Sequence, residues 1–370
     1  MLATIGLGQA GGNIANLFSE RGVPSLAINY SSKDLETCSH IEHKLKLIGS
    51  EGVGKQREEA VRLFHNNYES AIAFVKEHLS QPSIEVILII FSTAGGSGSG
   101  ISSILSELLI NEMPDKTFVI CPILPTVSEC ITAQLNTLDT LTSLSDLDAC
   151  IVPLDNSKCT LKDGIGKSYK SVNESFANSI LTIFNYTNMH SVNGNFDSRD
   201  LRTLLSTKGF VSIGECDISK LTNEGVQLNE EKVTAQIQQS HVTSIYTSPS
   251  HGQIIRAGLI CDVQENLMRY INVSSILNQF SNQPLDVFEG YHHEQKGRVM
   301  SIYTGLTFNQ ARLNEIEQLA TQQIETFQST LKSTSITVNR PTLNGANSLT
   351  KNKKAISDIL NKHKKNTISR

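Results

Sequence analysis

The sequence predicts an α/β fold in its first half, followed by a smaller α+β domain, a C-terminal helix and a disordered basic tail. Short apolar runs alternate with longer amphipathic stretches in the first half, which is typical of βαβ units that build a parallel sheet. The chain has 370 residues, more than one hydrophobic core usually organises. Its composition, 39% hydrophobic and 18% charged, excludes collagen-like and wholly disordered chains.

The first half contains six apolar runs of strand length and four longer amphipathic stretches. We expect strands at Leu2–Leu7, Ser25–Asn29, Leu45–Ile48, Glu85–Ser92, Thr117–Leu124 and Ala149–Leu154. We expect helices at Gly11–Arg21, Lys55–Leu79, Gly100–Asn111 and Ala133–Leu144. An apolar stripe over 169–189 predicts one more helix, which connects the two domains over about 168–190.

The expected domain boundaries follow from these patterns. The first domain spans 1–190 and includes the connecting helix, and the second spans 191–308. The second domain shows strand-like runs at Phe210–Gly214, Val242–Thr247, Ile254–Cys261 and Val299–Leu306. Apolar residues at steps of three and four predict a helix over 309–333. Residues 334–370 are polar and Lys-rich, so we expect a flexible tail with at most a short helix near Ala355–His363.

Charge is distributed unevenly along the chain. Residues 340–370 hold eight Lys or Arg and one Asp, a net charge of +7, which leaves −11 on the rest of a chain whose total is −4. We therefore expect the tail, and not the body, to meet a polyanion or an acidic protein surface.

The cysteines and the apolar runs predict the cellular compartment of the protein. The seven cysteines form no C-x-x-C pair, which favours free thiols in a reducing cytosol. The longest apolar run, Val86–Phe91, is far shorter than the ~20 residues that cross a bilayer, and no signal peptide precedes it. We expect a cytoplasmic protein without a membrane partner.

Three glycine-rich loops follow expected strands. Gly6–Gly11 reads G-x-G-x-x-G, but Asn29 stands where a dinucleotide site needs an acid, so an NAD-dependent oxidoreductase is only an alternative. Gly49–Gln56 misses a Walker A loop by one residue, which leaves Gly52 and Gly54 as candidates beside phosphate or Mg²⁺. Thr93–Gly100 places four glycines between a buried strand and a helix, where bare backbone and the hydroxyls of Thr93, Ser97 and Ser99 suit a polyphosphate.

These loops carry a family resemblance. The run Ala94-Gly95-Gly96-Ser97-Gly98-Ser99-Gly100 resembles the tubulin/FtsZ signature G-G-G-T-G-[ST]-G. The runs 8–13 and 27–35 are similar to the first and second phosphate loops of that family. The resemblance implies a Rossmann-like GTPase domain that binds GTP or GDP with Mg²⁺. The implied nucleotide contacts are Gly8, Gln9, Ala10, Gly11, Gly12, Asn13, Asn29, Ala94, Gly95, Gly96, Ser97 and Gly98, to which the second glycine loop adds Gly52 and Gly54.

The resemblance extends to the ribose and the base. Pro125–Glu129 resembles the family's ribose loop, which makes Glu129 the ribose partner. Val152–Asn156 resembles the Ile-Pro-Asn-Asp segment and implies that Asn156 contacts the nucleotide. Asn178 falls where the family places an Asn against guanine, and an amide offers both a donor and an acceptor to that base. The residue that stacks on the base stays open.

The segment Asn195–Asp200 reproduces the family's N-x-D-x-x-[DE] synergy loop. In tubulin-like polymers this loop enters the nucleotide pocket of the next subunit, which implies that Asn195, Asp197 and Asp200 are catalytic. The local alternative is an Asx-turn with a helix N-cap at Asp197. We assign no metal-ligating residue, since His292-His293-Glu294 has no third ligand in register and reads as a solvated turn.

The predicted function is that of a tubulin-like GTPase whose active site is completed by a neighbouring subunit in a head-to-tail filament. The basic tail after a long helix resembles the TubZ group of plasmid and phage partition proteins, so we expect DNA segregation through a centromere-binding adaptor that the tail engages. DNA contact would be indirect. A phage-spindle protein of the PhuZ type and a nucleotide-dependent binding module that does not polymerise are the remaining alternatives.

Overall fold

The computed structural model describes residues 1–158, 165–191, 193–194, 196–223, 228–292, 294 and 296–333. The chain divides into a compact unit, 1–324, and a second unit, 325–370. The expectations for Cys159, Asn195, His293 and the tail 334–370 lie outside the described residues.

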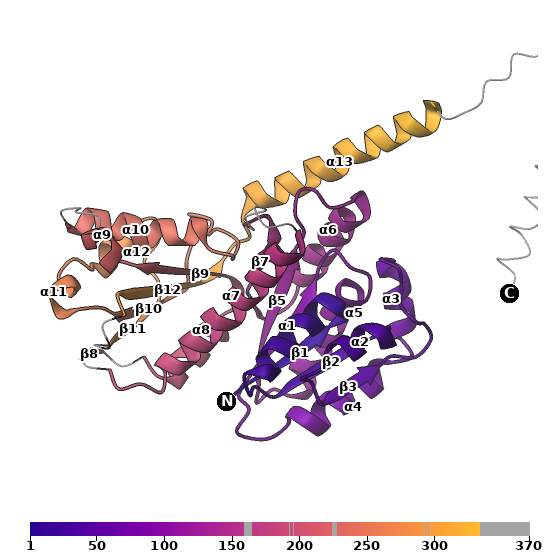
Figure 1. Ribbon diagram of the computed structural model, residues 1–370, viewed down its shortest axis with the longest axis horizontal. Coiled ribbons are helices and arrows are strands. Elements are labelled where there is room, and N and C mark those ends of the chain that lie inside the picture. The colour runs from indigo at the N-terminus through magenta and orange to yellow at the C-terminus, as the bar shows by residue number, and fades with distance from the viewer. Residues whose placement is uncertain are drawn as a thin grey trace, which may run out of the picture. The chain divides into compact units, whose positions relative to one another are not determined.

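Six parallel strands form the first half of the sheet (Figure 1). They run in the order β3-β2-β1-β4-β5-β6, and the short β7 (Leu154–Asp155) also pairs with β5. Three of the strands have the predicted bounds, and β3 begins two residues earlier than expected. The bounds are β1 Leu2–Leu7, β2 Ser25–Asn29, β3 His43–Lys46, β4 Val86–Ser92, β5 Thr117–Leu124 and β6 Cys150–Ile151.

Helices connect these strands, and one predicted helix is wrong in extent. The expected helix over 55–79 is two helices, because the buried Asn67 donates its amide to the carbonyl oxygens of Leu63 and Ile48 and ends the first of them. The helices are α1 Gly8–Glu20, α2 Ser32–Thr37, α3 Arg57–Phe64, α4 Tyr68–Leu79, α5 Ser97–Glu112, α6 Ile131–Ser145 and α7 Ile165–Tyr186, with a 3₁₀ turn at Asn156–Lys158.

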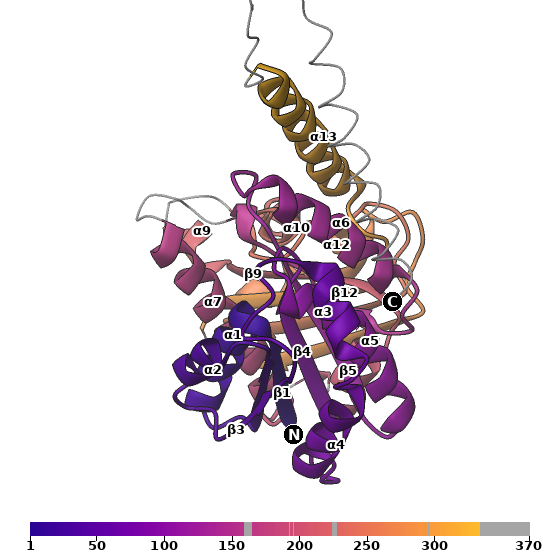
Figure 2. The same ribbon diagram turned by 90° about the vertical axis from the view of Figure 1, so that its right-hand side faces the viewer.

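The central strand β4 shows why the sheet is covered on both faces. Ile87, Ile89 and Phe91 point into the cluster formed with α3, α4 and α5, whereas Leu88 and Ile90 point into the cluster formed with α1 and α7. Alternate residues of a strand face opposite sides, so a continuous apolar run buries both faces. Figure 2 shows α1 on one side of β1 and β4, and α3 and α5 on the other.

The sheet continues into the second half in the order β6-β9-β12-β10-β11-β8. Its strands are β8 Asn193–Gly194, β9 Gly209–Asp217, β10 Arg256–Asp262, β11 Asp286–His292 and β12 Arg298–Leu306. One face packs on α10 (Glu230–Thr243), α11 (Glu265–Met268) and α12 (Val273–Leu277). The other face packs on α7 and α8 (Ser198–Leu205), which lie between the two halves in Figure 1. The remaining helices are α9 (Ser219–Asn223) and α13 (Gln310–Ser333).

Two sequence predictions in this half are wrong. Val242–Thr247 is not a strand, because its first two residues belong to α10, which ends at Thr243, and Tyr246 makes only an isolated bridge with Leu154. His292 is not in a solvated turn, because it ends β11 and is 1% exposed. Strand β11 has exposed and partly charged first residues, and no apolar run in the sequence predicts it.

The cysteines and the helix hydropathy bear on the expected cellular compartment of the protein. Among the described residues six cysteines are free thiols, of which five are buried and Cys130 is exposed. Within the same residues, no helix combines the length and apolar character that a bilayer crossing requires.

Candidate nucleotide pocket and synergy loop

A cavity of about 550 Å³ opens at the carboxyl ends of β1 and β4. These two strands are neighbours, and the chain turns away from them in opposite directions along the sheet. Ligands of doubly wound sheets bind at this switch point. The cavity is lined by Leu7, Gly8, Gln9, Ala10, Asn13, Ser31, Asp34, Gly52, Val53, Gly54, Lys55, Ser92, Ala94, Gly95, Gly96, Ser97, Gly98, Ile123, Glu129, Asn156, Tyr169 and Asn173.

Two helices begin at the cavity without a side-chain cap. The residues before α1 and α5, Leu7 and Gly96, offer no side-chain hydrogen bond to the first turn of the helix that follows. Backbone N–H groups at a helix start need a partner, and the helix dipole favours a negative one. The two loops also touch, because a Cβ on Gly8, which has a φ of 68°, would lie 3.0 Å from the Gly98 nitrogen. The floor of the cavity is therefore bare backbone, which suits an anion.

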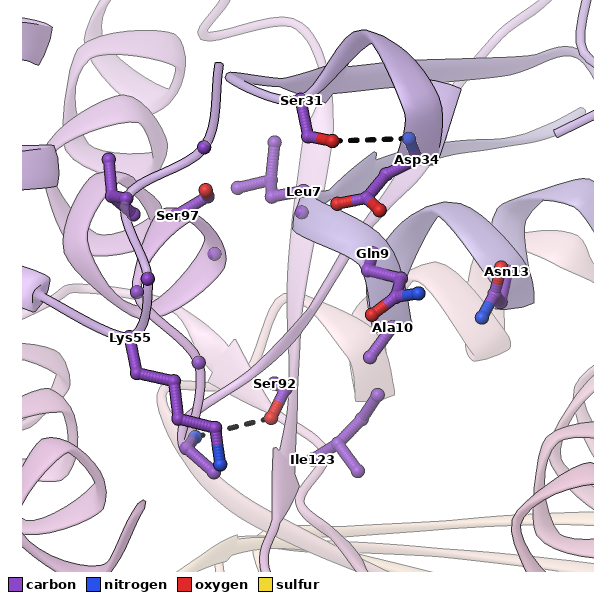
Figure 3. Close-up of a pocket in the computed structure, with 18 of the residues that line it drawn as sticks. Leu7, Gln9, Ala10, Asn13, Ser31, Asp34, Lys55, Ser92, Ser97 and Ile123 are labelled. Atoms are coloured by element: carbon purple, nitrogen blue, oxygen red, sulfur yellow. Dashed lines mark hydrogen bonds between the residues drawn. The ribbon is translucent and has the colours of Figure 1, made fainter. Parts of the chain in front are cut away.

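The side chains of the third glycine loop do not all face the cavity. Ser97 does, and Figure 3 shows it across the pocket from Asp34. Thr93 is buried and donates to the Ile123 carbonyl at 3.0 Å, and Ser99 is buried and donates to the carbonyl oxygens of Gly95 and Gly96. The expected phosphate role of the Thr93 and Ser99 hydroxyls is therefore wrong, because both hold the loop in shape.

A buried amide, which the sequence did not reveal, joins two of the loops. Asn136 of α6 donates to the carbonyl oxygens of Lys55 at 2.9 Å, Gly95 at 3.0 Å and Ala94 at 3.2 Å. It is 6% exposed and does not line the cavity. Asn136 thus fixes the second glycine loop against the third.

The charged side chains at the cavity are few. Lys55 is the cation among the described lining residues, and Asp34 and Glu129 are the carboxylates. Lys55 has a φ of 65°, which strains a residue with a side chain, and its Nζ lies 3.5 Å from the Cys130 Sγ. A hydrogen bond from the Ala133 backbone lowers the pKa of that thiol, and the Lys55 charge adds to the effect.

The far end of the cavity is built by α7 and the loop after β5. The Tyr169 hydroxyl donates to Glu129 Oε1 at 3.2 Å, and the Thr126 backbone N–H donates to the same oxygen at 3.2 Å. Asn173, one turn further along α7, also lines the cavity. The structure does not bring Asn178 there, because that residue is on an exposed face of the helix.

Thirteen of the predicted binding residues line the cavity, and four do not. Gly11 and Gly12 pack instead, since a Cβ on Gly11 would overlap the Ile90 carbonyl oxygen and one on Gly12 would lie 3.0 Å from the Cys38 Sγ. Asn29 does not line the cavity, but its side-chain amide donates to Oδ2 of Asp34, which does, at 3.0 Å. The fourth is Asn178. The cavity is also lined by residues that were not among the predicted contacts, including Ser31, Asp34, Lys55, Tyr169 and Asn173.

The predicted catalytic loop lies at the other end of α7. Tyr169 and Tyr186 are 17 residues apart on this helix, a rise of ~25 Å at about 1.5 Å per residue. Asp197 and Asp200 form the capping box of α8, in which Asp197 accepts from the N–H of Asp200 at 3.0 Å and Asp200 accepts from that of Asp197 at 3.1 Å. Burial raises the pKa of Asp200. These carboxylates cannot reach the cavity of their own chain.

Metal ligands of the protein alone do not gather anywhere in the described part of the chain. No three His, Cys, Asp or Glu side chains converge there. The Asp34 carboxylate points into the pocket beside Gln9 in Figure 3, and a magnesium ion takes one or two carboxylates together with phosphate oxygens. The residues therefore fit Mg²⁺ held jointly with a nucleotide, and not a metal site of protein ligands alone.

The strand order and the glycine-lined cavity are typical of mononucleotide-binding α/β proteins. Residues 1–160 match the Tubulin/FtsZ family, GTPase domain, as predicted. The whole described fold is the tubulin/FtsZ fold.

Relatives of two groups match the chain. A tubulin-like protein CetZ of Pyrococcus horikoshii is 25% identical over 323 residues, which cover 82% of this chain and 84% of the relative. A tubulin-like protein TubZ of Clostridium botulinum C phage is 32% identical over 179 residues, 46% of this chain and 49% of that protein. The TubZ of Bacillus thuringiensis serovar israelensis, solved as a GTPγS-form protofilament, has a TM-score of 0.76 at 16% identity and covers 90% of this chain and 94% of its own. The last likeness shows the fold alone.

Proposed function

We propose that the cavity binds GTP and, after hydrolysis, GDP. The observation that carries this proposal is the pair of uncapped helix N-termini, at Gly8 and Ser97, that meet at the switch point of the sheet. The phosphates would lie on this backbone, the ribose beside Glu129, and the base between Tyr169 and Asn173. Bound Mg²⁺ would offset the phosphate charge, with Asp34 as its protein ligand, because Lys55 alone cannot balance a triphosphate and two carboxylates.

Hydrolysis is proposed to need a second copy of the chain. The synergy loop and the pocket lie at opposite ends of α7, so the carboxylates of one subunit can reach the pocket of the next in a head-to-tail filament. There Asp197 and Asp200 would orient the attacking water for in-line displacement. Asn195 would belong to the same loop. Assembly then switches on turnover, and turnover weakens the filament.

The first experiment measures GTP turnover against protein concentration. A site shared between two subunits gives a threshold, below which specific activity vanishes, because assembly follows mass action. A self-contained site gives constant specific activity, and that result would refute the filament mechanism. ATP and NAD serve as competitors, and displacement of GTP by NAD would support the oxidoreductase alternative instead.

Replacing Asp200 tests the synergy loop directly. Asp200→Asn keeps the size of the side chain and one acceptor oxygen for the Asp197 N–H, so we expect normal GTP affinity and stable filaments. Turnover should fall by about 10²-fold or more, since water activation is lost. The matched control is Asp217→Asn, because Asp217 also caps a turn by accepting from the Ser219 N–H, at 3.0 Å, outside this loop. Wild-type turnover in Asp200→Asn would remove the loop from the mechanism.

The cellular role that we propose is segregation of plasmid or phage DNA. The support is the net charge of +7 on 340–370, set against an acidic body, which suits docking to an adaptor protein on DNA. The phage-spindle alternative predicts tail contacts within the polymer. Both TubZ and CetZ proteins match the chain, so the tail and not the family match favours partition.

A further inference from the structure

A buried arginine connects the C-terminal helix to two loops of the pocket. Arg312 lies in the first turn of α13 and is 7% exposed, and its partner Asp155 is 2% exposed. Its Nε donates to Asp155 Oδ2 at 3.0 Å and its Nη2 to Asp155 Oδ1 at 3.2 Å, a two-pronged pairing. The same Nη2 donates to the Pro125 carbonyl oxygen at 2.6 Å.

Both partners of Arg312 adjoin residues that line the cavity. Asp155 directly precedes Asn156, and Pro125 begins the loop that carries Glu129. Asp155 also shapes its own loop, since its Oδ1 accepts from the Ser157 N–H at 3.0 Å. One guanidinium therefore holds together the loop after β5 and the loop after β7, from a helix whose described side chains do not line the cavity.

The chemistry of this contact favours arginine alone. The planar guanidinium satisfies two carboxylate oxygens and a carbonyl at fixed angles, which a lysine ammonium does not reproduce. Removing the guanidinium would leave the Asp155 carboxylate buried without a counter-charge, and such a group draws in water or moves. The start of α13 is also fixed beside it, because Asn309 accepts from the Arg312 N–H at 3.1 Å and donates to the Ser248 carbonyl at 3.0 Å.

We propose that Arg312 is a positioning residue that couples the start of α13 to nucleotide binding. The inference rests on the proposed function of the cavity as a GTP site. When nucleotide orders the loops at Glu129 and Asn156, it also orders the first turn of α13, and a change imposed on α13 changes nucleotide affinity by the same coupling free energy. Whatever engages the chain beyond α13 would thereby sense the nucleotide state.

The test is the release rate of a fluorescent GDP analogue from the full chain, measured below the assembly threshold. We expect Arg312→Gln to raise the dissociation rate about tenfold, within the usual range of coupling between sites. Arg312→Lys keeps a positive charge beside Asp155, so this variant tests the proposal even where Arg312→Gln fails to fold. We expect it to raise the dissociation rate by a smaller but clear amount. The matched control is Arg256→Gln, which breaks another arginine–aspartate pair, to Asp286 at 2.7 Å, at residues that do not line the cavity.

Hydrogen exchange distinguishes coupling from a purely structural role of Arg312, because only coupling makes exchange in α13 depend on bound nucleotide. In the wild type, GDP should slow backbone exchange at 310–316, and in Arg312→Lys this protection should be lost although the nucleotide is bound. Three results would overturn the coupling. The dissociation rate could equal that of the wild type in both Arg312 variants, or it could rise as much in Arg256→Gln. The nucleotide could also leave backbone exchange at 310–316 unchanged. A wild-type chain that binds no guanine nucleotide would overturn the proposed function itself, and that outcome is distinct from these.

Discussion

At the scale of single residues, Asn136 shows how a side chain outside the pocket shapes it. We expect Asn136→Ala to lower the free energy of unfolding by about 1–3 kcal/mol, because buried carbonyl groups lose their donor. GTP affinity should fall as well, since the loops at Lys55 and Gly95 separate. Urea unfolding and nucleotide titration measure the two effects. Thr142→Ala is the control on the same helix, because the exposed Thr142 hydroxyl donates only to the Leu138 carbonyl.

A second residue, His241, makes the stability depend on pH. It is fully buried between the hydroxyls of Ser212 and Ser301, at 2.9 and 2.7 Å, and burial lowers its pKa to about 3. The folded state therefore lacks a proton that the unfolded state takes up below about pH 6.5. This contribution to stability is complete above pH 6.5 and is lost as the pH falls toward 3.

The prediction for His241 concerns how steeply the free energy of unfolding changes with pH. The free energy of unfolding should fall by about 1.4 kcal/mol per pH unit below 6.5 through this group alone. In His241→Asn that part of the slope should vanish, whatever the stability of the variant at pH 7.5. Urea unfolding at pH 7.5, 6.5 and 5.5 compares the two proteins, and equal slopes would show that His241 is not the responsible group.

At the scale of elements, α7 separates two asparagines that lie only five positions apart. Asn173 lines the cavity and Asn178 is exposed. Five residues turn a helix by about 500°, so the two side chains point about 140° apart around its axis. We expect Asn173→Ala to weaken GTP binding about tenfold and to reduce the preference for GTP over ATP, as the loss of a base-recognising amide would. Asn178→Ala is the matched control and should bind as the wild type does. The reverse result would restore the assignment made from the family resemblance.

At the scale of the whole molecule, the tail and the body are predicted to act separately. Deletion of 340–370 removes a net charge of +7, so retention on an immobilised polyanion should be lost, while GTP turnover keeps its concentration threshold. Retention should also weaken with salt for the intact chain. Unchanged retention of the truncated chain would place the anion-binding surface on the body. Loss of the threshold would instead assign the tail to polymer contacts, as the phage-spindle alternative requires.

The sequence by itself determined the α/β class, the bounds of several buried strands and most of the residues that line the pocket. These features are local: a continuous apolar run can only be a buried element, and glycines between a strand and a helix leave bare backbone at the helix start. Only the tertiary structure decided which hydroxyls face the cavity, that Asn173 and not Asn178 lines it, and that Asn136 and Arg312 hold the loops. Those contacts join residues that are distant in the chain, and the direction of a side chain depends on helix phase and packing, which no local pattern contains.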